Sequence, residues 1–254
     1  MNAIAIVENV IDSQSPWKLP RLEPGFTAYP YTKSIEEWNS LLTRANSGDG
    51  EAECEVAWLY DDGCKAPSGK ILVRRSQRKA AEWFLRSAEH GFGPAQNTIG
   101  VYLGDGTGIA RDPIEALRWL KGAHRAGESS AANNIAITYR QYGDFCQAVR
   151  WFRASIASGD DETRIQLGVH QYWGIGVRTD HDAAIINFKK ATKAKFITEA
   201  GRDDAFFYLG VAYLEGKGIR KSISSARRML ERANRDNDHP AAGKLLKLLD
   251  NERK

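Results

Sequence analysis

Apolar residues recur along most of the chain at the spacing of an α-helix, in short segments separated by glycine-rich turns. The stretch 94–127 has the clearest pattern and predicts two helices joined by a loop. Asp112 is the predicted N-cap of the second helix, Pro113 suits its first position, and Gly127 suits its end. The apolar face of this helix follows the spacing i, i+3, i+4, i+7: Ala116, Trp119, Leu120 and Ala123. One hairpin cannot bury these faces alone, so we expect stacked copies, with Trp119 buried between them.

Four further copies of this hairpin are recognisable. Each copy has a small residue in its first helix: Ala57, Gly100, Ala136, Gly168 and Gly210. Each also has an alanine in its second helix: Ala80, Ala116, Ala148, Ala184 and Ala226. The alanine of one copy precedes the small residue of the next by 20 residues three times and by 26 residues once. Loops tolerate insertions and packed helices do not, so the extra residues near 196–202 predict a longer loop in the fourth copy.

Two segments carry a family resemblance. LGVAYLEGKG at 209–218 and RDPIEALRWLKGA at 111–123 resemble Sel1-like repeats, relatives of the tetratricopeptide repeat. The resemblance implies an all-α fold, a right-handed α-solenoid of about five stacked helical hairpins with capping helices at both ends. It also implies a scaffold that binds proteins and shares no catalytic residues across the family.

The repeat divides the chain into four kinds of segment. Residues 1–33 are predicted to form an extended arm rich in proline and aromatic residues, which packs on the first helices or lies in the concave groove, with a disordered tail as the alternative. Residues 34–49 are predicted to form an N-terminal capping helix and 240–254 a C-terminal one. The five repeats between them, within 50–238, are predicted at about 50–91, 94–127, 129–159, 161–200 and 203–238. The first repeat has a long loop at 63–75.

Composition excludes little. The net charge is +4, with 36 basic and 32 acidic residues. A charge this close to balance does not by itself predict binding to a polyanion such as nucleic acid. The three cysteines, Cys54, Cys64 and Cys146, have no paired phase and predict free thiols in a reducing, cytoplasmic compartment. We expect neither a signal peptide nor a membrane span.

No motif indicates catalysis. The loop GDGTG at 104–108 could be taken for a phosphate cradle, but it lacks the Lys-Ser/Thr of a P-loop. Matching glycines recur in phase at 174 and 176 and at 216 and 218, which favours an architectural role. The sequence contains neither HExxH nor a zinc-type cluster, so we predict no catalytic residues, no metal and no cofactor.

A concave surface is the predicted site. In the related tetratricopeptide geometry, positions around the small residue of each first helix point into the groove. They form an apolar strip with a polar fringe, as protein interfaces do. The predicted partner-binding residues are Trp58, Asp61, Asp62, Asn97, Val101, Asp105, Asn133, Ile137, Arg140, Val169, Tyr172, Trp173, Phe207, Val211 and Glu215.

These features predict a non-enzymatic cytoplasmic scaffold that holds a partner protein in its groove. By analogy of fold, a bacterial immunity protein against a toxin, or a secretion-linked regulator, would fit. Two alternatives stay open. The arm and the first loop could build a pocket for an enzyme or a ligand-binding module, or basic clusters on the outer face could bind nucleic acid, which would give steep salt dependence. The oligomeric state is also left open.

Overall fold

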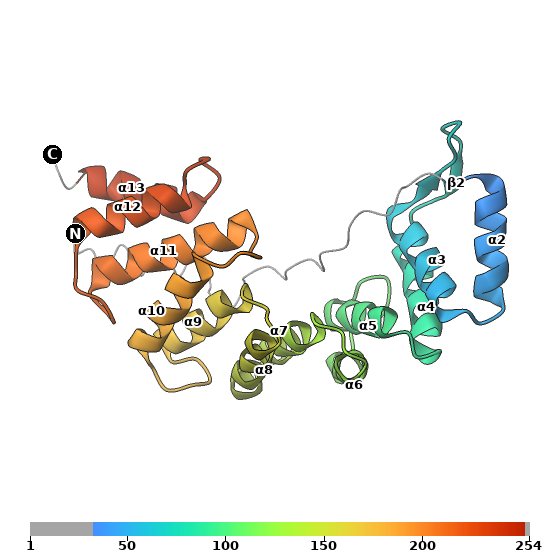
Figure 1. Cartoon of the computed structure of the whole chain (residues 1–254), viewed down its shortest axis with the longest axis horizontal. Coiled ribbons are helices and arrows are strands. Elements are labelled where there is room, and N and C mark those ends of the chain that lie inside the picture. Colours follow the sequence, from blue (N-terminus) through green and yellow to red (C-terminus); the bar gives the residue numbers. More distant parts are fainter. Residues whose placement is uncertain (1–32, 252–254) are drawn as a thin grey trace. The chain divides into compact units, whose positions relative to one another are not determined.

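The computed structural model describes residues 33–251, which contain twelve helices and one two-stranded sheet. These residues divide into two compact units, 33–138 and 139–251, and the division falls within one helix. The elements along the chain are coloured in sequence order in Figure 1. The all-helical fold with repeated helical hairpins is confirmed.

The first unit holds five complete helices, the sheet and most of a sixth helix. They are α2 (Ile35–Asn46), α3 (Gly50–Asp62), β1 (Cys64–Lys65), β2 (Ile71–Val73), α4 (Gln77–Glu89), α5 (Gly93–Asp105), α6 (Pro113–Arg125) and the start of α7 (Ala131–Tyr142). Helix α3 packs against α4, and α5 packs against α6. The predicted capping helix at 34–49 corresponds to α2, whose N-cap Ser34 forms a capping box with Glu37.

The second unit holds the rest of α7 and six complete helices. They are α8 (Phe145–Ala157), α9 (Thr163–Trp173), α10 (His181–Ala191), α11 (Glu199–Glu215), α12 (Ile223–Ala233) and α13 (Pro240–Asn251). Helix α9 packs against α10, α11 against α12, and α12 against α13. Residues 1–32 and 252–254, which include most of the predicted arm and the end of the C-terminal segment, lie outside the described residues.

Helix boundaries follow local signals in the sequence. The side chain of Asp112 accepts hydrogen bonds at 3.0 Å from the backbone N–H groups of Ile114 and Glu115, as predicted for an N-cap. Equivalent caps begin other second helices of hairpins: Ser76, Asp144, Asp180 and Ser222. Gly127 follows the end of α6 with a positive φ of 92°, a conformation that glycine adopts without steric cost.

Two sets of glycines set the packing distances. Gly100, Gly168 and Gly210 lie where the two helices of a hairpin touch, and a Cβ at Gly168 would come within 2.5 Å of the Phe188 ring. The second glycine of each glycine-rich turn lies against the start of a helix in a preceding hairpin. A Cβ at Gly218, for example, would lie 2.6 Å from the carbonyl oxygen of His181. The recurring glycines therefore have the architectural role that their phase predicted.

Two expectations need correction. The long loop of the first repeat contains an antiparallel hairpin, in which Cys64 pairs with Val73 and Lys65 with Ile71. The branched residues of β2 favour extended backbone, and Gly69 at φ 81° allows the reversal. Trp119 is half-buried rather than buried, because Leu120 takes the fully buried position in α6. The Arg118 guanidinium lies 5.1 Å from the Trp119 ring centre.

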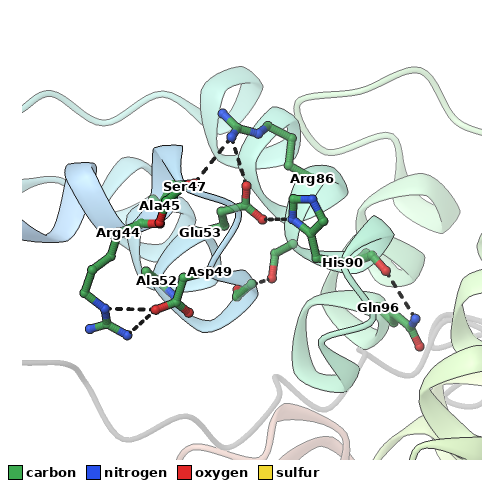
Figure 2. Close-up of polar contacts among 12 residues, drawn as sticks. Arg44, Ala45, Ser47, Asp49, Ala52, Glu53, Arg86, His90 and Gln96 are labelled. Carbon is green, nitrogen blue, oxygen red and sulfur yellow. Dashed lines mark hydrogen bonds and ion pairs between the residues drawn. The ribbon is translucent and has the colours of Figure 1, made fainter.

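A buried carboxylate joins α3 to α4. The side chain of Glu53 is fully buried, and Figure 2 shows it between Arg86 and His90. One carboxylate oxygen lies 2.9 Å from an Arg86 guanidinium nitrogen and the other 2.6 Å from His90 Nδ1. Arg86 also donates to the carbonyl of Ala45 in α2, at 3.4 Å. A buried charge requires such partners, so this network fixes the register of the first three helices.

Candidate functional site

The predicted site residues lie on the first helix of each hairpin, in both units. Helices α3, α5 and the start of α7 carry the members in the first unit: Trp58, Asp61, Asp62, Asn97, Val101, Asp105, Asn133 and Ile137. The end of α7 with α9 and α11 carries those in the second unit: Arg140, Val169, Tyr172, Trp173, Phe207, Val211 and Glu215.

Much of the expected apolar strip is buried. The members that are buried are Asn97, Asn133, Ile137, Arg140, Val169, Tyr172, Phe207 and Val211. Of these, Val169, Tyr172, Phe207 and Val211 belong to one core cluster together with apolar residues of α10, α12 and α13. The expectation of a continuously exposed strip is wrong for these positions, because neighbouring hairpins use the same faces to pack.

In the second unit, an aromatic cluster remains partly accessible around Trp173. The Trp173 ring is half-buried and lies 4.7 Å from the Tyr172 ring and 5.8 Å from the Tyr208 ring, both in edge-to-face geometry. Tyr208 in turn stacks on Phe188 at 5.2 Å. The Trp173 indole therefore packs on a buried aromatic core, and part of its surface is accessible to solvent. We call Tyr172, Trp173, Tyr208, Glu215 and Lys217 the Trp173 patch.

A polar group is held beside that indole. The Tyr172 hydroxyl donates to a Glu215 carboxylate oxygen at 2.5 Å, and Lys217 Nζ lies 3.2 Å from the same oxygen. Burial raises the pKa of Tyr172 well above its usual range, and the Glu215 carboxylate raises it further, so the phenol stays protonated and donates. Lys217 is half exposed and can exchange its contact with Glu215 for one with a ligand.

In the first unit, a second aromatic row contains the predicted residue Trp58. Its ring meets Phe84 edge-to-face at 4.9 Å, and Phe84 meets Tyr102 at 5.4 Å. Burial raises the pKa of Tyr102 above its usual range, and the neighbouring Asp61 carboxylate contributes. We call Trp58, Asp61, Phe84 and Tyr102 the Trp58 patch, in which Trp58 is half-buried.

The sequence identified some positions and missed their partners. Asn97 was predicted together with Asn133, but the side chain that donates to Asn97 is that of Asn134, at 3.0 Å. Asn97 itself donates to Ser130 at 3.2 Å. In the second unit, buried Arg140 donates to Gln166 at 2.6 Å. Asn134 and Gln166 were not among the positions expected in the groove, because each lies two residues before the small residue of its helix.

The alternative site at the first loop also has a defined structure. The β1–β2 hairpin borders a hollow of about 610 Å³, whose lining includes Cys64, Lys65, Ile71 and Arg75. Among residues 33–251, no group of three or more His, Cys, Asp and Glu side chains is placed to hold a metal ion. None of the helices that the structure describes is long and apolar enough to cross a bilayer.

A family model described as Sel1 repeat matches four segments that together make up half of the chain. They are residues 68–92, 93–125, 163–196 and 204–238. The matched segments leave out the third predicted repeat, 129–159. In that repeat Ala148 follows Ala136 by only 12 residues, because its turn is shorter.

Solved structures of low sequence identity share the fold. A protective antigen present in uropathogenic Escherichia coli strains, displaying an SLR fold, is 20% identical with a TM-score of 0.71, over 98% of this chain and 49% of that one. The chain thus spans about half the length of that protein. A Sel1 repeat protein from Oxalobacter formigenes is 21% identical with a TM-score of 0.67, over 96% and 86% of the two chains. An immunity protein from Pseudomonas aeruginosa is 15% identical with a TM-score of 0.44, over 98% of this chain and 82% of that one. This similarity is too low to inform function.

Proposed function

The chain belongs to the Sel1 repeat family, and from that premise we propose that it is a non-enzymatic scaffold that binds another protein through the Trp173 patch. The observation that carries the proposal is the half-buried indole of Trp173, fixed on a packed aromatic core beside a charged pair. Aromatic side chains of this kind are the usual anchors of protein interfaces, and the polar groups around them give specificity.

The geometry favours recognition over chemistry. The groups around Trp173 are a phenol that stays protonated, a carboxylate that accepts its hydrogen bond, and a lysine at the rim. A partner that brings an apolar side chain against the indole and an acidic group to Lys217 would be complementary. The Trp58 patch offers a similar indole in the first unit, and we propose that it contributes further contacts.

The proposed partner is a protein, with a toxin or effector as the class that the family resemblance suggests. Binding would use residues that are already ordered, so the entropy cost on this side of the interface would be small. A role as an immunity protein predicts that the partner's toxic activity is blocked in the complex.

The test begins with capture of the partner. The tagged full-length chain, expressed in its own host, should retain one protein in stoichiometric amount, and that protein is then purified. Trp173→Ala should weaken its binding at least about tenfold, since a truncated Trp anchor costs about 2 kcal/mol or more. Tyr172→Phe keeps the ring and removes only the hydroxyl, so a smaller loss is expected.

Trp119→Ala is the matched control. It removes a half-buried indole from the second helix of a hairpin in the first unit, outside the residues of the Trp173 patch, and should leave affinity within about threefold. Circular dichroism confirms that each variant is folded. Equal losses for Trp173→Ala and Trp119→Ala would contradict the proposal, as would capture of nucleic acid with steep salt dependence in place of a protein.

A further inference from the structure

The fourth hairpin carries a second feature, separate from the Trp173 patch, which the proposed function does not use. The segment 192–198, between α10 and α11, contains only part of the insertion predicted near 196–202, because residues 199–202 belong to α11. Together with α9 and α10 it surrounds a hollow of about 560 Å³. We propose that this hollow docks an acidic polypeptide segment that carries an apolar side chain.

The segment is held in a defined conformation. Arg202 donates to the carbonyl of Ala194 at 3.1 Å, and Thr198 donates to the Glu162 carboxylate at 2.5 Å. Ile197 packs against the core of the second unit. Phe196, between these anchors, is 81% exposed, so the anchored segment presents its ring to solvent. An apolar ring fixed outward in this way is a contact surface, since water solvates it poorly.

The charge around the hollow is strongly positive. Its lining includes Lys189, Lys190, Lys193 and Lys195, all exposed. Within residues 33–251, none of these four lysines forms an ion pair with an acidic side chain. Lys195 Nζ instead lies 5.1 Å from the centre of the Phe196 ring. Four unneutralised ammonium groups around one hollow attract a segment with several carboxylates.

Two further groups distinguish a polypeptide from other anions. Ile186 lines the hollow and is 53% exposed, so an apolar side chain inserted there would gain buried area. Asp161 also lines the hollow, with one carboxylate oxygen 2.6 Å from Arg164 Nε. A carboxylate in this position can accept hydrogen bonds from peptide N–H groups, which the phosphodiesters of nucleic acids do not have.

The experiment measures binding of a short fluorescent peptide to the full chain by fluorescence anisotropy. The peptide consists of glutamate and aspartate residues with two leucines. Lys189→Glu with Lys193→Glu should weaken binding of this peptide at least about tenfold. Phe196→Ser should weaken binding of the leucine-containing peptide several-fold. A second peptide, in which serines replace the leucines, should bind the wild type more weakly, and Phe196→Ser should hardly change its affinity. All these positions are exposed, so the fold should be unaffected.

The matched control is Lys244→Glu with Lys247→Glu, which makes the same change in net charge on exposed positions of α13. This variant should keep the peptide affinity within about twofold. Equal weakening in both double variants would show non-specific attraction and overturn the proposal. Stronger binding to single-stranded DNA, or to vesicles containing phosphatidylserine, than to the leucine-containing peptide would also overturn it. Loss of partner binding in Trp173→Ala would leave peptide docking intact, so the two proposals fail separately.

Discussion

The buried histidine of α9 should make stability fall steeply below neutral pH. His170 is 3% exposed, with its ring 5.3 Å from that of Phe152 and its Nδ1 at 2.8 Å from the carbonyl oxygen of Ile175. Burial lowers the pKa of His170 to about 4, although the hydrogen bond from Nδ1 to the carbonyl oxygen of Ile175 raises it. The nearby Arg140 cation lowers the pKa a little further. The ring is therefore neutral in the folded protein at neutral pH.

The sign follows from the two pKa values. In the unfolded chain, His170 takes up a proton near its ordinary pKa of 6.5, while the folded protein does so only near 4. Above about pH 6.5 neither state is protonated and the full stability is present. As the pH falls from there towards about 4, protonation favours the unfolded chain, and stability is lost. The difference between the pKa of 6.5 in the unfolded chain and about 4 in the folded protein corresponds to roughly 3 kcal/mol of stability.

The variant His170→Gln separates this effect from the titration of carboxylates. Glutamine retains an N–H donor for the Ile175 carbonyl and does not titrate. Urea unfolding of both proteins, followed by circular dichroism from about pH 7.5 to about pH 4.5, gives the free energy of unfolding at each pH. The wild type should lose up to roughly 3 kcal/mol more than the variant over this range. Parallel pH curves for the two proteins would refute the reasoning, since they would mean that His170 is protonated equally readily in both states.

Three further outcomes are expected. Gly168→Ala should destabilise the protein by about 1–3 kcal/mol in thermal or urea unfolding, because the new methyl group overlaps the buried Phe188 ring; an unchanged stability would show that the hairpin can open there. In native protein treated with a thiol reagent, Cys146 should react quickly and Cys54 slowly, since Cys146 is exposed and burial raises the pKa of Cys54 to about 12. Mass spectrometry that finds Cys54 labelled first would contradict this. Glu53→Gln should lower the unfolding free energy by about 1–3 kcal/mol, measured in urea, whereas an increase would mean that burial of the charge is not compensated by its partners.

The repeated hairpins and their boundaries could be predicted from the sequence because the signals are local. A spacing of 3.6 residues marks the buried side of each helix, and a cap such as Asp112 marks its start. Glycines repeated in phase mark turns and close helix contacts, and Gly168 against Phe188 is one result. Each of these features depends on residues that lie within one helix or one hairpin, so the sequence alone is enough to predict them.

The accessible surface was decided by the tertiary structure. Tyr172 and Trp173 are adjacent in sequence and were predicted together, yet Tyr172 is 3% exposed and bonded to Glu215 while Trp173 is half-buried. The periodicity of a first helix shows which positions face away from its own hairpin. It does not show which of them the next hairpin covers, because that depends on how two hairpins stack. The partners of buried polar groups, such as Arg86 for Glu53, depend on the same stacking, and for that reason only the folded chain determined them.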